Sequence, residues 1–189
     1  MNIGLFFGSY NPVHIGHLAI ANFMVEFTDI DQVWFVISPQ NPFKKRRTLL
    51  ADHHRLEMVR IVVADDPRFR ESDIEFRMPV PSYTIDTLAW LGEKYPKHRF
   101  GLIMGSDGLT GFDKWKNAAE IITNHTRYVY PRPGFHFNMQ DHPNTVLVEA
   151  PGIDISATMI REGIKKGKDM RHFLPPGVWE YIDQMNLYK

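Results

Sequence analysis

The sequence predicts an α/β fold in which helices flank a parallel β-sheet. Two observations predict it. Short apolar runs, rich in aromatic and β-branched residues, alternate along the chain with segments of helical periodicity. The apolar runs also lack polar–apolar alternation, as is typical of strands buried on both faces. Strand and helix in repeated succession favour right-handed crossovers and a Rossmann-like sheet, and we find no domain boundary within residues 1–189.

The elements follow in order. Strands are expected at residues 2–7, 33–37, 99–104 and 126–130. Helices are expected at residues 16–27, from 52 onward, from 82–84 to 95, at about 117–124, from 156 onward, and from after 176 to about 187. Asp52 is a good N-cap for the second helix. The apolar faces of the second and fifth helices are Leu56, Val59 and Val63, and Met159, Ile160 and Ile164. Residues 136–144 are expected to form a long loop.

Composition narrows the class of protein. The chain has no cysteine, which excludes disulfides and thiol chemistry and fits a reducing cytosol, so we expect a cytoplasmic location. Lysine plus arginine and aspartate plus glutamate both number 22, so no global charge favours nucleic acid. No apolar run is long enough to span a membrane. We therefore expect neither nucleic acid nor a membrane as a partner, and a homo-oligomer stays open.

The stretch "GSYNPVHIGH" at residues 8–17 predicts an anion-binding loop. It follows the first strand and opens the first helix, where Gly8 and Ser9 allow a tight turn with exposed N–H groups. Gly16 permits a close approach, and His14 and His17 bring two imidazoles to a helix N-terminus. A phosphate loop of the G-x-x-x-x-G-K type is absent, and a zinc pair lacks a third ligand at metal spacing. We therefore predict no metal site made by the protein alone.

A second candidate site is "ISATMIR" at residues 155–161. Ser156 and Thr158 lie at a predicted helix start, where hydroxyl and N–H groups can bind phosphate, and the planar fork of Arg161 suits phosphate oxygens. After the third strand, Gly105 lets a backbone pass close to a nucleotide, and Asp107 can accept hydrogen bonds from ribose hydroxyls.

Two more loops contribute candidates. Trp115 lies among polar neighbours, where its ring could stack on a flat heterocycle, although a core tryptophan is the alternative. The basic run 44–47 follows a strand end, and Lys44 is a candidate phosphate contact, although such runs are usually solvated. The expected fold places Arg132, in "PRPG", near the phosphate groups of a bound nucleotide.

Together the two motifs resemble those of nucleotidyltransferases, H-x-G-H and I-S-x-T-x-I-R. With "PSYT" (81–84), "GSD" (105–107), "KW" (114–115) and "RPG" (132–134), the chain is most similar to the bacterial nicotinate-nucleotide adenylyltransferases along nearly its whole length. The resemblance implies a nucleotidyltransferase-type fold. It also implies a reaction in which nicotinate mononucleotide and ATP, with Mg²⁺, give deamido-NAD and pyrophosphate in NAD biosynthesis.

Roles for individual residues follow from the resemblance and the loop chemistry together. His14, His17 and Arg161 are the expected catalytic residues. Those expected to bind ATP are Gly8, Ser9, Tyr10, His14, Gly16, His17, Gly105, Asp107, Arg132, Ile155, Ser156, Thr158 and Arg161. Those expected to bind the mononucleotide are Lys44, Tyr83, Thr84 and Trp115.

The chain departs from the family pattern at Tyr10-Asn11, where Phe-Asp is common. Asparagine can form the same turn but carries no charge. Two other functions stay open. One is a phosphopantetheine adenylyltransferase, against which His14, Trp115 and the second motif argue. The other is a non-catalytic nucleotide sensor on the same fold.

Overall fold

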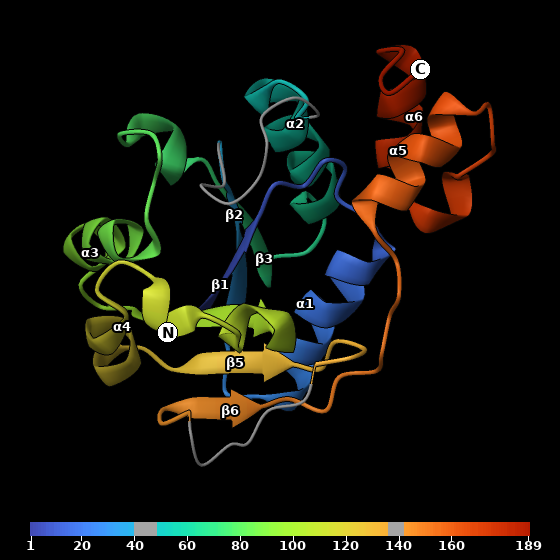
Figure 1. Cartoon of the computed structure of the whole chain (residues 1–189). Helices are drawn as coiled ribbons and strands as arrows, with labels where there is room; N and C mark the ends of the chain where they lie inside the picture. The colour runs from blue at the N-terminus through green and yellow to red at the C-terminus, as the bar shows by residue number, and fades with distance from the viewer. Residues whose placement is uncertain (40–48, 136–141) are drawn as a thin grey trace.

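The computed structural model of the chain describes residues 1–39, 49–135 and 142–189. Within these ranges lies a six-stranded parallel sheet in the order β3-β2-β1-β4-β5-β6 (Figure 1). The strands are β1 (Asn2–Gly8), β2 (Gln32–Ile37), β3 (Phe69–Ser72), β4 (Arg99–Gly105), β5 (Arg127–Tyr130) and β6 (Thr145–Leu147). The predicted α/β fold with a parallel sheet is confirmed.

Residues of the central strands alternate between two apolar clusters, one on each face of the sheet. In β1, Phe6 belongs to one cluster, whereas Ile3 and Leu5 belong to the other. In β2, Phe35 and Trp34 divide in the same way. Both faces of these strands are therefore buried, which explains why the sequence shows continuous apolar runs there.

Helices cover both faces (Figure 1). The cluster that contains Phe6 receives residues from α1 (Ile15–Phe27), α2 (Asp52–Val63), α5 (Ala157–Lys165) and α6 (Pro176–Gln184). The opposite cluster receives residues from α3 (Thr84–Lys94) and α4 (Ala118–Asn124). Short 3₁₀ helices lie in the connections: η2 (Ile74–Arg77), η3 (Ser106–Leu109), η4 (Phe112–Lys114) and η6 (Arg171–Phe173). Among the described residues, no helix has the length and apolar character needed to cross a bilayer.

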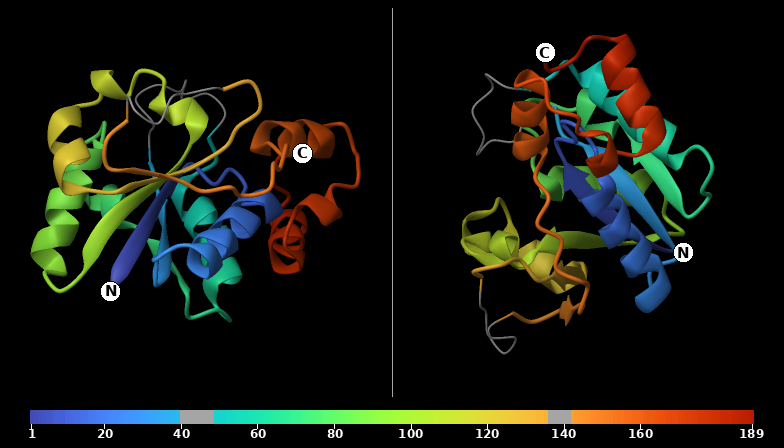
Figure 2. Two further views of the ribbon diagram at one scale, coloured as in Figure 1. Left: turned by 90° about the horizontal axis from the view of Figure 1, so that it is seen from below. Right: turned by 90° about the vertical axis from the view of Figure 1, so that its right-hand side faces the viewer.

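The C-terminal helices pack against helices from the first third of the chain. After β6, at the sheet edge, the chain crosses to α5, so that α5 and α6 come to lie near α1 and α2 (Figure 2). Nδ1 of His54 in α2 and Oη of Tyr181 in α6 are 2.8 Å apart in a hydrogen bond. This crossing brings the second sequence motif to the same end of the molecule as the first.

The sequence does not predict β3 and β6, the two edge strands. β3 contains no fully buried residue, and in β6 Val146 and Leu147 are 41% and 43% exposed. Edge strands that bury so little apolar surface have no continuous apolar run to mark them. Of the expected loop 136–144, residues 136–141 lie outside the described residues.

Three details of the predicted helices are wrong. Asp52 is not an N-cap, because Ala51 takes that position and Asp52 begins α2. Met159 is 37% exposed, whereas Ile160 and Ile164 are buried. Successive residues on a helix lie about 100° apart, so Met159 cannot share the buried stripe of Ile160. Finally, α6 ends at Gln184.

Candidate active site

A cavity of about 800 Å³ opens at the carboxyl ends of β1 and β4, where the strand order of the sheet reverses. Open α/β sheets bind their ligands at such a point, and the volume is within the usual range for small-molecule sites. The predicted site residues that line it are Gly8, Ser9, Tyr10, His14, His17, Gly105, Asp107, Trp115, Arg132, Ile155, Ser156, Thr158 and Arg161. Gly16 lines a smaller adjoining hollow together with both histidines.

The two histidines of the first motif stack on each other. Their ring centroids are 3.7 Å apart and their planes are inclined by 29°. His14 is the N-cap of α1, and His17 lies in its first turn as predicted. The backbone N–H of His14 donates to Nδ1 of His17 at 3.2 Å. Because Nδ1 accepts this bond, a neutral His17 ring carries its hydrogen on Nε2 and can donate from there.

His14 is almost fully enclosed, with 6% of its surface exposed. Burial, and secondarily the Arg132 guanidinium, lowers the pKa of His14 to about 4. The imidazole is therefore neutral at neutral pH. Its Nδ1 is buried and has no hydrogen-bond partner in the described part of the chain. Buried polar atoms without a partner are rare in folded proteins, and here the His14 side chain faces the backbone N–H of His17 in a capping-box arrangement.

Two glycines make room for the polar side chains of the cavity. A Cβ on Gly16 would lie 3.1 Å from Nδ1 of His14 and 3.3 Å from Cγ2 of Ile153. The close approach expected at Gly16 is thus made by groups of the protein itself. A Cβ on Gly105 would lie 3.0 Å from Cγ of Arg132 and would collide with the Asp107 carboxylate.

The second motif meets the first through Arg161. Nη1 of Arg161 donates to the carbonyl oxygen of Asn11 at 2.7 Å, across 150 residues of sequence. Nη2 donates to Oγ1 of Thr158 at 3.2 Å. Ser156 is the N-cap of α5, and its Oγ accepts the backbone N–H of Met159. The two motifs therefore face one cavity, with Arg161 as the link between them.

Two oppositely charged residues, Arg132 and Asp107, lie close together on the β4–β5 side of the cavity. Nε of Arg132 lies 3.9 Å from Oδ1 of Asp107, and the two side chains are 38% and 52% exposed. The backbone N–H of Arg132 donates to Oγ of Ser106 at 2.8 Å, which fixes the start of the 131–134 turn against η3. Both charged groups are accessible to a ligand in the cavity.

Trp115 is half-buried at the cavity wall. Its ring stacks on Phe112, with centroids 4.7 Å apart and planes inclined by 30°. It also packs against the apolar cluster beside α3 and α4. Trp115 is therefore both a core residue and a cavity residue, because one part of its ring packs in the apolar cluster and another part borders the cavity.

Two residues predicted for the mononucleotide, Tyr83 and Thr84, lie outside the cavity lining. Tyr83 and Thr84 form the start of α3 and do not border the cavity. Lys116 connects this start to the Trp115 loop, because its Nζ lies 2.8 Å from Oδ2 of Asp86 and 4.9 Å from the centroid of the Tyr83 ring. Lys44 lies outside the described residues.

The buried ring of Tyr10 shapes the turn between β1 and α1. Tyr10, and not Gly8, adopts the left-handed conformation, with φ of 45°. Its ring is 1% exposed, and its Oη donates to the carbonyl of Phe6. A Cβ on Gly8 would lie 2.7 Å from Cζ of Tyr10, so Gly8 is needed to seat that ring.

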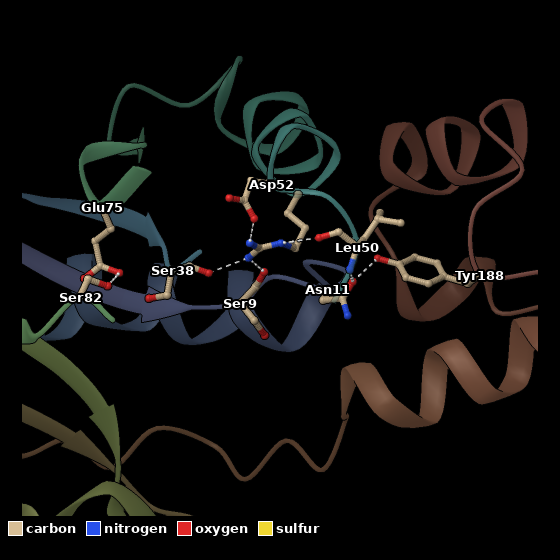
Figure 3. Close-up of polar contacts among 9 residues, drawn as sticks. Ser9, Asn11, Ser38, Leu50, Asp52, Glu75, Ser82 and Tyr188 are labelled. Carbon is tan, nitrogen blue, oxygen red and sulfur yellow. Dashed lines mark hydrogen bonds and ion pairs between the residues drawn. The ribbon is translucent and has the colours of Figure 1, made fainter. Parts of the chain in front are cut away.

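Asn11 acts as an uncharged acceptor inside the fold. Its Oδ1 accepts the backbone N–H of Leu50 at 3.3 Å and the Oη–H of Tyr188 at 2.8 Å (Figure 3). These bonds tie the first motif to the approach to α2 and to the segment after α6. An aspartate could accept the same two bonds.

Sequence reasoning missed two charged residues that are buried in the fold. Arg55 and Glu75 are 0% and 2% exposed, and Glu75 accepts hydrogen bonds from Ser82 at 3.0 Å and Thr87 at 2.9 Å. Both residues belong to charged types that are almost never fully buried unless paired. No signal in the sequence distinguished them, or Tyr188, from surface residues.

Comparison with known proteins places this arrangement in a family. The family model described as cytidylyltransferase-like matches residues 5–163, which include both motifs. The chain belongs to the cytidylyltransferase-like family. It is 52% identical to a protein of Flavobacterium johnsoniae named probable nicotinate-nucleotide adenylyltransferase, over all of both chains. It is 50% identical to a protein of the same name from Cytophaga hutchinsonii, over 100% of this chain and 98% of the relative.

A solved structure agrees with the cytidylyltransferase-like fold. The nicotinic acid mononucleotide adenylyltransferase of Plasmodium falciparum, complexed with NaAD, matches with a TM-score of 0.81 at 22% identity. The match covers 99% of this chain and 97% of that one. The family resemblance predicted from the two motifs is therefore confirmed, and the nucleotidyltransferase type of fold with it.

Proposed function

We propose that this protein transfers the adenylyl group of ATP to nicotinate mononucleotide, giving deamido-NAD and pyrophosphate. One observation carries the proposal, namely the 2.7 Å hydrogen bond from Arg161 to Asn11 that brings both nucleotidyltransferase motifs to one cavity. Full-length relatives at about half identity, named for this activity, support the choice of reaction.

The proposed reaction does not require a strong general base. An oxygen of the mononucleotide phosphate attacks the α-phosphorus of ATP, the bond from that phosphorus to the bridging oxygen breaks, and pyrophosphate leaves with the electron pair. The nucleophile is already an anion. Catalysis is therefore mostly positioning of the two phosphates and stabilisation of the charge that develops on them.

The cavity wall supplies donors for that charge. The tautomer of His17 presents an Nε2–H donor, and Arg161 supplies a planar cation in the lining of the same cavity. His14, whose pKa is about 4, contributes a neutral ring that packs against His17 and fixes its orientation. We assign His17 and Arg161 to the phosphates of ATP, and His14 to the support of His17.

Magnesium enters the proposal with ATP, as the MgATP substrate. In phosphoryl-transfer sites Mg²⁺ is held largely by phosphate oxygens and water, with one or two carboxylates. Asp107 is the carboxylate of the cavity lining that fits such a role.

Pyrophosphate release with ATP and three acceptors tests the function. Nicotinate mononucleotide should support turnover, whereas nicotinamide mononucleotide and phosphopantetheine should not match it. An N–H donor that faces a carboxylate in one substrate would face an NH₂ group in the other. We expect kcat/KM to favour nicotinate over nicotinamide about ten- to a hundredfold, the value of one charge-assisted hydrogen bond. Phosphopantetheine as the best acceptor, or no pyrophosphate with any of the three, would overturn the proposal.

A further inference from the structure

A buried arginine outside the cavity organises the loop that faces ATP. Arg55 lies in the first turn of α2 and is 0% exposed. It does not line the cavity. An arginine in the interior is tolerated only when its donors are satisfied. The groups that accept hydrogen bonds from Arg55 therefore show which parts of the chain it holds in place.

The guanidinium of Arg55 donates to backbone carbonyls from separate parts of the chain. Nη1 donates to the carbonyl of Ser9 at 2.6 Å and to that of Ser38 at 2.8 Å, and Nε donates to the carbonyl of Leu50 at 3.1 Å. Nη2 pairs with the Asp52 carboxylate, the one charged partner among these acceptors. Figure 3 shows the four acceptor residues converging on this group.

The bond to Ser9 sets the direction of the next backbone amide. In a planar trans peptide the C=O and the following N–H point in opposite directions. When Arg55 draws the Ser9 carbonyl toward α2, the N–H of Tyr10 is turned away from α2. Ser9 and Tyr10 both line the cavity, so this bond orients a backbone segment that borders it.

The bond to Leu50 reaches the same loop at a second place. The carbonyl of Leu50 accepts from Arg55, and the N–H of Leu50 donates to Oδ1 of Asn11. The carbonyl of Asn11 in turn accepts from Arg161. The Ser9–Asn11 backbone is therefore held between two guanidinium groups, one behind the loop and one at the cavity.

We propose that Arg55 is a positioning residue for ATP, which holds the Ser9–Asn11 backbone in the conformation that binds the phosphates and aligns Arg161. The inference rests on the proposed function only for the presence of ATP in the cavity, and not for the identity of the acceptor. Arg55 acts through the loop and touches no substrate.

Lysine at position 55 separates this role from simple stability. R55K keeps the charge but loses the planar fork of five donors that reaches three carbonyls and the Asp52 carboxylate together. The matched control is R60K on the same helix, where Arg60 is about half exposed and lies 3.7 Å from Glu57 and Glu71. We expect R55K to lose about tenfold or more in kcat/KM for ATP at temperatures well below its Tm, with R60K within about twofold of wild type. A folded R55K with wild-type kcat/KM for ATP would overturn the proposal.

Direct titration of each protein with MgATP, without acceptor, keeps this test independent of the reaction. Weaker binding by R55K than by R60K supports the role even if the wild-type acceptor differs from nicotinate mononucleotide. Equal dissociation constants for the two variants overturn it. If R55K does not fold, Asp52→Asn replaces it, because the Asp52 side chain is 46% exposed and its loss loosens the same guanidinium. A raised Kd for MgATP supports the proposal, and an unchanged Kd contradicts it.

Discussion

The part of the site that we assign to ATP and the segments expected to bind the mononucleotide are built differently. On the ATP side, His14 is 6% exposed and stacked on His17, and Arg161 is bonded to a backbone carbonyl 150 residues away. On the acceptor side, the start of α3 is joined to the Trp115 loop by Lys116 and Asp86, whose side chains are 45% and 41% exposed. Exposed ion pairs of that kind contribute about 0–1 kcal/mol.

This difference indicates that the two sides have different roles in the reaction. Groups that stabilise charge in the transition state gain most from a rigid, enclosed setting, because no reorganisation is then required at the moment of reaction. The acceptor side is held by contacts that can rearrange at little cost. Changes on the ATP side should therefore act mainly on turnover and on ATP, and changes on the acceptor side mainly on the mononucleotide.

The largest effect is expected at His17. His17→Ala removes the Nε2–H donor and should lower kcat by about 10²–10³-fold, the range for loss of one preorganised charge stabiliser. The measurement is steady-state pyrophosphate release, with the fold checked by circular dichroism. His53→Ala, at an exposed histidine, is the control and should leave kcat unchanged. A folded His17→Ala with near-normal kcat would remove His17 from the reaction.

His14 should make the fold sensitive to acid. Its pKa is about 4 in the folded chain and about 6.5 in the unfolded one, so between these values the unfolded state binds the extra proton. Stability is retained above pH 6.5 and falls as the pH drops toward 4. At pH 4.5 the unfolding free energy should have lost about 2–3 kcal/mol through this residue relative to pH 7.

Denaturant titrations of the wild type and His14→Gln at both pH values isolate that contribution. The glutamine variant should lose less stability on acidification by about the same amount, because it has no imidazole to titrate. Parallel losses in the two proteins would show that His14 keeps an ordinary pKa, and would remove the argument for a neutral ring beside His17.

Arg161→Lys tests whether Arg161 acts on ATP and not on the mononucleotide. The lysine keeps the charge but cannot hold Asn11 and a phosphate with one planar fork. We expect about a tenfold loss in kcat/KM when ATP is varied, with the KM for the mononucleotide within about twofold. Equal increases in both KM values would contradict the assignment of Arg161 to the ATP side.

Trp115→Ala probes the acceptor side. Loss of a stacking face should raise the KM for both nicotinate and nicotinamide mononucleotides about two- to tenfold, since stacking does not distinguish a carboxylate from an amide. The ratio of kcat/KM for the two acceptors should stay constant. A collapse of that ratio would mean that Trp115 orients the carboxylate contact as well.

The smallest effect is expected at Asn11. Asn11→Asp restores the residue common in the family and can accept the same bonds from Leu50 and Tyr188. At pH 7 we expect a kcat within about threefold of wild type, measured by pyrophosphate release. A large gain in kcat would instead show that a negative charge here contributes to the reaction.

The sequence predicted the parts of the molecule that carry a local signal. The four central strands, the N-terminal position of His17 in α1 and the position of Ser156 at the start of α5 all follow from short patterns. The edge strands β3 and β6 bury too little apolar surface to be marked. Arg55 and Glu75 could not be found because their burial depends on carbonyls and hydroxyls supplied by distant segments. Tyr83 and Thr84 were assigned by resemblance, and the structure places them outside the cavity lining.

The long separation between the two motifs has a consequence for synthesis of the protein. Asn11 leaves the ribosome before its partners Arg161 and Tyr188, which follow 150 and 177 residues later. A nascent chain that has formed β1 and α1 still lacks the bonds that fix its phosphate loop. Since proteins emerge N-terminal end first, the loop that we assign to ATP cannot gain all of these bonds until strands β1 to β6 and the helices on both faces of the sheet have been made.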